Sequence, residues 1–125
     1  MITASKFILP GIIFVLTLAS GVWLSNAGKP YNNAIFAIHK LIALSAVVLA
    51  AIQMVAGFKT ADLTTLLIVL AVAAILAVIA LFATGALMSL DKEPYKVWLT
   101  IHQTAPAVMS IAGAAIIYLL ERGQA

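Results

Sequence analysis

The chain has 125 residues, of which 65% are hydrophobic and 9% are charged, and its formal net charge is +3. So few polar side chains cannot cover a water-soluble globule, and the composition therefore indicates a protein of the lipid bilayer without a soluble domain. The basic residues are scattered rather than gathered in a dense run, so we expect no nucleic-acid partner. Because the chain has no cysteine, disulfides, thiolate-held metals and covalently attached haem are excluded, and any cofactor needs other ligands.

Four apolar stretches follow one another, at residues 7–24, 34–56, 63–90 and 97–120. A spanning segment needs about 20 apolar residues and must pair its backbone polar groups internally, so each stretch is predicted to be a transmembrane helix. The segments between them, residues 25–33, 57–62 and 91–96, are short and make neighbouring helices antiparallel. The predicted fold is one all-α integral membrane domain over residues 1–125, an antiparallel up-down-up-down four-helix bundle made of two repeated helical hairpins.

An internal repeat relates the two halves, approximately residues 1–60 and 61–125. At one offset of 64 residues the matched pairs include Ser20 with Thr84, Gly21 with Gly85, Pro30 with Pro94, and Tyr31 with Tyr95. After a one-residue gap, His39 aligns with His102, and these are the only histidines in the chain. Copies with an even number of spans point the same way, so both histidines are expected on one side of the bilayer. Because the first stretch has a repeat partner, we expect it to be a retained helix rather than a signal peptide.

The two matched histidines indicate a bis-histidine haem site, which needs two imidazoles at one depth on opposing helices. The alternative is a structural hydrogen bond from each histidine to a neighbouring helix. Gly21 and Gly85 lack a Cβ atom, so they would let the edge of a macrocycle approach the backbone, although small residues also pack membrane helices without any cofactor.

This pattern, with histidines on the second and fourth stretches and glycines on the first and third, resembles membrane b-type cytochromes. That group includes respiratory cytochrome b and the cytochrome b561-like carriers, and the resemblance covers nearly the whole chain. In respiratory cytochrome b each ligand helix carries a second histidine further along. The corresponding positions here hold Ile52, Gln53, Ala115 and Ile116. The resemblance therefore implies one haem b per chain, with His39 and His102 as the axial ligands of the iron.

The function implied by this resemblance is single-electron transfer between a quinone or redox partner and an acceptor. Because protein ligands fill both axial positions, we expect an electron carrier rather than a stand-alone catalyst. Haem propionates would extend toward the loops, where lysine and tyrosine side chains are candidates to bind them, although snorkelling at the interface also explains the lysines. These candidates are Lys29, Lys40, Lys92, Lys96, Tyr31 and Tyr95.

Two other functions stay open from the sequence. One is a membrane anchor or structural subunit of a larger redox complex, and the other is a small transporter without cofactor. The transporter is disfavoured because the four acidic residues lie at the ends of the spans, where they complete no proton relay. The family's usual topology implies an inner (plasma) membrane protein with cytoplasmic termini, although the distribution of lysines mildly opposes this orientation. The oligomeric state is left open.

Overall fold

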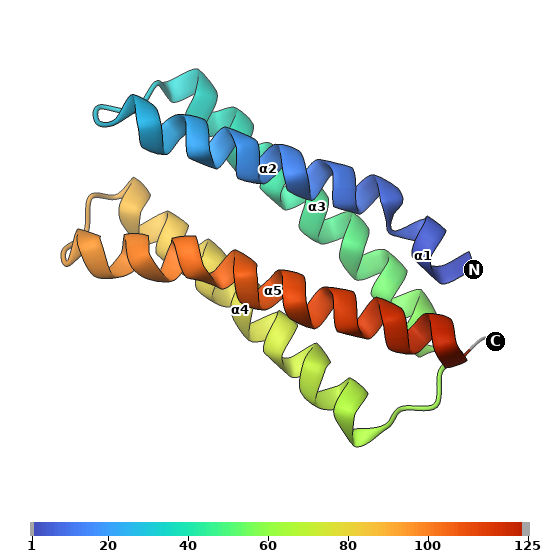
Figure 1. Cartoon of the computed structure of the whole chain (residues 1–125). Coiled ribbons are helices and arrows are strands. Elements are labelled where there is room, and N and C mark those ends of the chain that lie inside the picture. The colour runs from blue at the N-terminus through green and yellow to red at the C-terminus, as the bar shows by residue number, and fades with distance from the viewer. Residues whose placement is uncertain (1, 124–125) are drawn as a thin grey trace. The chain divides into compact units, whose positions relative to one another are not determined.

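The computed structural model describes residues 2–123, and within this range the chain is helical without any strand. Its elements are α1 (Ile2–Lys6), α2 (Ile8–Ala27), α3 (Asn33–Phe58), α4 (Thr65–Ser89) and α5 (Tyr95–Gly123), shown in Figure 1. The helices α2 to α5 are each long and apolar enough to cross a membrane. The four predicted helices are therefore confirmed, with ends that differ from the predicted ones by a few residues.

The short helix α1 is a feature that the hydrophobic pattern does not predict. It is separated from α2 at Phe7, three residues before Pro10. Proline has no N–H to bond the carbonyl four residues earlier, and its ring clashes with that carbonyl, which here belongs to Lys6. The helical hydrogen-bond ladder therefore stops at Lys6 and restarts at Ile8.

The connections carry residues that end one helix and begin the next. Gly28, which follows α2, has a φ of 72°, a conformation that glycine adopts without steric cost. The side chain of Asn32 then accepts hydrogen bonds from the backbone N–H groups of Ala34 and Ile35, at 2.9 and 3.2 Å, and so caps α3. Thr64 caps α4 in the same manner by accepting from the N–H of Leu67 at 3.2 Å.

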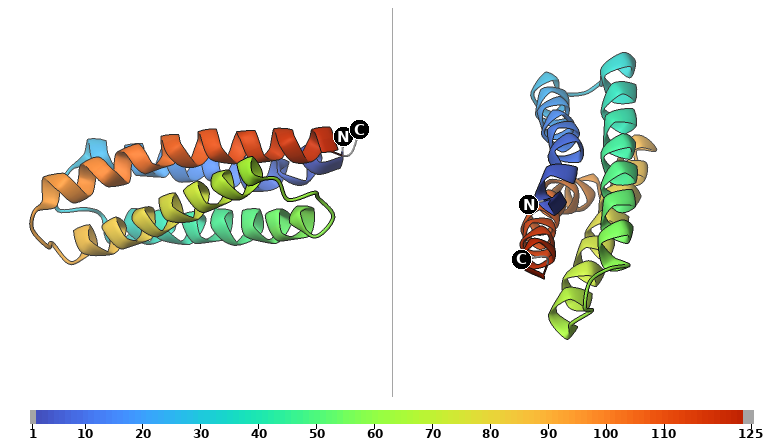
Figure 2. Two further views of the ribbon diagram at one scale, coloured as in Figure 1. Left: turned by 90° about the horizontal axis from the view of Figure 1, so that it is seen from below. Right: turned by 90° about the vertical axis from the view of Figure 1, so that its right-hand side faces the viewer.

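The chain divides into two units, Met1–Ala61 and Asp62–Ala125. In the first unit α2 packs against α3, and in the second α4 packs against α5. Figures 1 and 2 show that each pair is an antiparallel hairpin, and that α4 and α5 diverge toward the ends opposite their connecting loop. Each short loop thus sets the antiparallel direction predicted for its pair.

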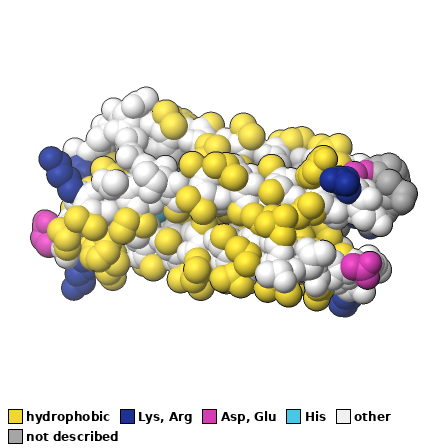
Figure 3. All heavy atoms as spheres, turned by 60° about the horizontal axis from the view of Figure 1, so that its bottom comes forward, with side chains coloured by type: hydrophobic (Ala, Val, Ile, Leu, Met, Phe, Trp, Pro, Cys, Tyr) yellow, Lys and Arg dark blue, Asp and Glu magenta, His cyan; other side chains and the backbone are white. Residues whose placement is uncertain are grey.

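The long helices keep large apolar side chains on their surface. Leu41 on α3 is 64% exposed and Ile111 on α5 is 72% exposed. Figure 3 shows hydrophobic side chains along the length of the helices and charged side chains toward their ends. Water would penalise so much exposed apolar surface, whereas hydrocarbon accepts it, so the structure is compatible with an integral membrane protein.

Candidate functional site

The first histidine is held within the first hairpin. His39 on α3 places its Nδ1 atom 2.8 Å from the hydroxyl oxygen of Ser20 on α2. Ser20 is buried, and its hydroxyl donates to the backbone carbonyl of Thr17 at 2.9 Å. The backbone of Thr17 also hydrogen-bonds to the imidazole. The ring of His39 is therefore fixed to one turn of α2.

The second hairpin holds its histidine in the same way. Nδ1 of His102 on α5 lies 3.0 Å from the hydroxyl oxygen of Thr84 and 3.0 Å from the carbonyl oxygen of Leu81, both on α4. The Thr84 hydroxyl donates to the carbonyl of Ala80 at 2.6 Å. In the part of the chain whose side chains are described, Ser20 and Thr84 are the buried polar residues, and each contacts a histidine.

These contacts determine which imidazole nitrogen carries the hydrogen. A carbonyl oxygen can only accept, so Nδ1 of His102 must be the donor to Leu81. The Ser20 hydroxyl already donates to Thr17, so it accepts from Nδ1 of His39. In a neutral ring the lone pair then lies on Nε2, the nitrogen through which a histidine so held binds a metal.

Gly21 and Gly85 each lie against the histidine of their own hairpin. A Cβ atom on Gly21 would be 3.0 Å from Cε1 of His39, and one on Gly85 would be 3.3 Å from Cε1 of His102. The absence of a side chain therefore lets the imidazole approach the neighbouring helix. The passage of a macrocycle edge at these glycines stays a prediction.

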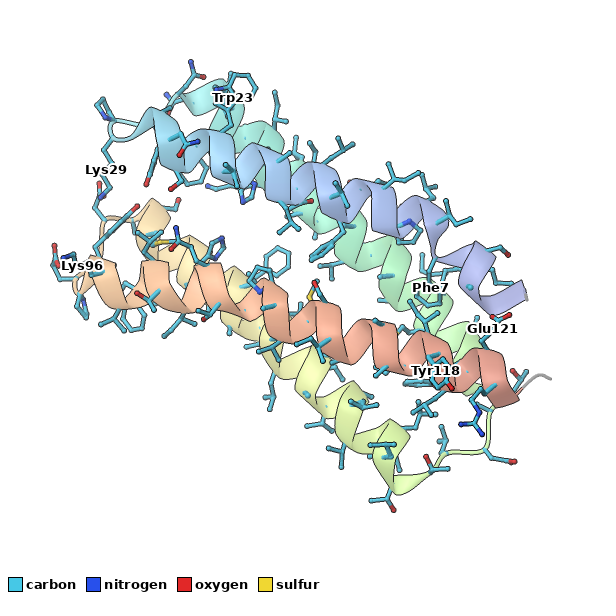
Figure 4. The ribbon with its side chains drawn as sticks, viewed as in Figure 1. Phe7, Trp23, Lys29, Lys96, Tyr118 and Glu121 are labelled. Carbon is cyan, nitrogen blue, oxygen red and sulfur yellow. The ribbon has the colours of Figure 1, made fainter. Side chains whose placement is uncertain are left out.

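The other predicted residues lie toward the loop ends of the hairpins. The ammonium group of Lys40 lies 4.2 Å from the ring centre of Phe36, and the ring of Tyr31 meets the same phenylalanine edge to face at 5.7 Å. Figure 4 shows Lys29 at the loop end of the first hairpin and Lys96 at the loop end of the second. Tyr95 begins α5 and is half-buried. Their role in binding propionates stays a prediction.

Two residues contact the histidines without having been predicted to do so, and a third, Trp98, has an unusual environment. Ser20 and Thr84 were visible as a matched pair in the repeat, and a hydroxyl one position before each glycine was the available signal. Trp98 on α5 has a buried indole N–H without a hydrogen-bond partner in the described part of the chain. No sequence signal distinguishes it from an ordinary interfacial tryptophan.

The fold and the histidine sites define an all-helical chain with four membrane-compatible helices and a fixed imidazole in each hairpin. Comparison with protein-family models, curated proteins and solved structures finds no match. Among the described residues no group of three or more histidine, cysteine, aspartate or glutamate side chains is placed to hold a metal ion.

The hydroxyl contacts lead to a stability prediction. Thr84→Val removes the hydroxyl that contacts His102 while keeping the shape of the side chain, and we expect it to lower the free energy of unfolding by about 1 kcal/mol. Titration with dodecyl sulfate in mixed micelles measures this, and Thr84→Ser should restore the loss. Thr100→Val is the matched control, because the exposed hydroxyl of Thr100 donates to the Lys96 carbonyl of its own helix, at 2.9 Å. Equal losses in the two valine variants would contradict the stabilising role of the Thr84 contact.

Proposed function

We propose that this chain is a membrane cytochrome that binds one haem b between His39 and His102 and transfers single electrons. The observation that supports the proposal most strongly is that the same nitrogen of each imidazole, Nδ1, is hydrogen-bonded within the protein. Each is bonded through Nδ1 within its own hairpin, which leaves the lone pair of the neutral ring on Nε2. A hydrogen bond from the second nitrogen is what orients metal-ligating histidines in general.

The donor set fits a haem better than a bare metal ion. Two imidazoles would supply both axial ligands of a haem iron, whose four remaining ligands come from the macrocycle. A bare zinc ion prefers four ligands and would need additional protein groups. Two neutral imidazoles in apolar surroundings would complete the ligand set of a haem iron. The same two imidazoles would leave a bare zinc ion with an incomplete ligand set.

In this proposal the haem supplies reversible one-electron chemistry between ferric and ferrous iron. The chain orients the ligands: Ser20 holds the ring of His39, whereas Thr84 and Leu81 hold that of His102. With His39 and His102 both holding the iron, no coordination site would be open to oxygen. The apolar helices exclude water around the ligands, and electrons are exchanged with a quinone or a redox partner protein.

A reduced-minus-oxidised absorption spectrum of the purified protein tests the proposal, together with a pyridine haemochrome assay. We expect a six-coordinate low-spin haem b at one haem per chain. Expression must include an adequate haem supply, and haem incorporation into a known cytochrome from the same cells is the control. A colourless protein under these conditions would overturn the proposal and return the histidines to structural hydrogen bonding.

A further inference from the structure

Each histidine has a buried hydroxyl oxygen as its neighbour on the opposite helix of its hairpin. Nδ1 of His39 lies 2.8 Å from the hydroxyl oxygen of Ser20, and Nδ1 of His102 lies 3.0 Å from that of Thr84. Ser20 is 9% exposed and Thr84 is 4% exposed. A hydrogen bond is stronger in such surroundings than in water, because the local dielectric constant is low. Both rings therefore have the same kind of acceptor in a place where its strength matters.

The direction of each hydroxyl is set by a backbone carbonyl of its own helix. The Ser20 hydroxyl donates to the carbonyl of Thr17 at 2.9 Å, and the Thr84 hydroxyl donates to that of Ala80 at 2.6 Å. A hydroxyl has one hydrogen, so each oxygen presents a lone pair to the Nδ1–H group of its histidine. The imidazole hydrogen bond thus depends on an oxygen that is itself held in place.

The glycine that follows each hydroxyl residue contacts the same ring at a second point. A Cβ atom on Gly21 would lie 3.0 Å from Cε1 of His39, and one on Gly85 would lie 3.3 Å from Cε1 of His102. Each ring therefore packs against the glycine while its Nδ1 atom meets the hydroxyl. Because the two contacts come from consecutive residues of one helix, they hold the ring in one orientation.

A hydrogen bond at Nδ1 changes how strongly the other ring nitrogen donates to a metal. The acceptor draws the proton partly away from the ring and raises the basicity of the ligating nitrogen. A more basic ligand stabilises ferric iron relative to ferrous iron, and hydrogen bonding around the ligands is one of the means by which proteins tune a haem. Hydroxyls are neutral acceptors and act more weakly than carboxylates. The expected effect is therefore several-fold in the redox equilibrium rather than many orders of magnitude.

We propose that Ser20 and Thr84 are positioning residues that set the donor strength of Nε2 in His39 and His102, and through it the reduction potential of the bound iron. The part of this proposal that concerns iron rests on the proposed function. Neither residue touches the iron, and each acts through the histidine that it contacts. Because the repeat places one hydroxyl on each ligand, loss of either one should shift the potential in the same direction.

Variants at the two positions separate this role from simple packing. Ser20→Ala and Thr84→Val remove the hydroxyl, whereas Ser20→Thr and Thr84→Ser exchange the residues of the two hairpins and keep it. Ser45→Ala is the matched control, because the exposed hydroxyl of Ser45 on α3 donates to the Leu41 carbonyl of its own helix, at 2.9 Å. Redox titration of the haem-loaded protein, followed by its absorption spectrum, gives the midpoint potential of each variant.

We expect each variant without the hydroxyl to keep a low-spin haem and to have a higher midpoint potential, because a less basic imidazole stabilises ferric iron less. The ferrous-to-ferric ratio at a fixed applied potential should rise about fivefold, where a tenfold rise corresponds to about 59 mV for one electron. The exchanged variants should stay closer to the unsubstituted protein, and Ser45→Ala should match it. Unchanged potentials in Ser20→Ala and Thr84→Val, with haem bound and stability lowered, would overturn the proposal while the cytochrome stands.

A measurement without haem distinguishes failure of this proposal from failure of the proposed function. Nitrogen-15 signals of the two rings, recorded on haem-free protein at a pH where both are neutral, report which nitrogen carries the hydrogen, and His39→Ala assigns them. We expect Nδ1 to carry it in the unsubstituted protein, and a larger share of Nε2–H at the affected ring in Ser20→Ala and Thr84→Val. If no haem binds, the proposed function is overturned, and this change of nitrogen supports the positioning role or, by its absence, overturns it too.

Discussion

Replacing His39 or His102 with alanine is expected to remove the low-spin six-coordinate haem spectrum. Each imidazole supplies one of the two axial ligands in the proposed site, so either variant leaves the iron with at most one protein ligand. We expect haem content to fall at least several-fold, or the remaining haem to become high-spin. Absorption spectra and the haemochrome ratio measure both outcomes, and added imidazole should partly restore the low-spin spectrum by occupying the vacated space.

The control for these variants must separate ligand loss from loss of structure. Gln103→Ala changes the residue next to His102, an exposed glutamine outside the histidine contacts, and should keep full haem content. Far-ultraviolet circular dichroism should show the same helical content in all variants. An unchanged low-spin spectrum in either histidine variant would refute the assignment of that histidine as a ligand.

The second large effect is expected at the glycines that face the histidines. In Gly21→Ala the new Cβ atom would lie 3.0 Å from Cε1 of His39, so the imidazole or the helix must shift. Overpacking of this kind typically costs about 1–3 kcal/mol of unfolding free energy. At Gly85 the corresponding distance is 3.3 Å, which a small displacement of His102 relieves. We therefore expect Gly21→Ala to be more destabilising than Gly85→Ala, measured by unfolding in mixed micelles.

Two other glycines provide the controls for this comparison, one on the helix of Gly21 and one on the helix that packs against that of Gly85. Gly11 on α2 and Gly113 on α5 have no atom within 4 Å of an added Cβ. Alanine should be tolerated there, or should stabilise by up to about 1 kcal/mol because it favours the helix. If Gly11→Ala and Gly21→Ala destabilise the protein equally, the contact between Gly21 and His39 is not what limits substitution at position 21.

Leucine variants test whether a macrocycle edge also passes these glycines. Gly21→Leu or Gly85→Leu should reduce haem loading, because the new side chain displaces the imidazole and would also fill the space of a macrocycle edge. If loading stays complete while stability falls, the glycine serves the imidazole alone. The haemochrome ratio and the unfolding curve, measured on one preparation, provide both quantities.

The sequence by itself determined the four long helices and their order. Their apolar lengths match a bilayer, and the short connecting segment within each hairpin makes its two helices antiparallel. It located the ends of the helices less well: α5 begins at Tyr95 rather than at residue 97, and α1 extends the chain before the first predicted helix. Hydrophobicity determines where a span is apolar, whereas capping hydrogen bonds, and prolines that cannot donate one, determine where the helix ends.

The sequence also predicted that His39 and His102 are the chemically important residues, because they occupy equivalent positions in the two halves of the repeat. Only the tertiary structure decided what each ring contacts. The apolar residues surround α2, α3 and α4 nearly completely, so periodicity does not reveal which side of a helix faces its partner. The rotation that brings Ser20 and Gly21 against His39 depends on the packing of the whole hairpin. For that reason the Nδ1 hydrogen bonds, the tautomer that follows from them and the buried donor of Trp98 emerged from the structure alone.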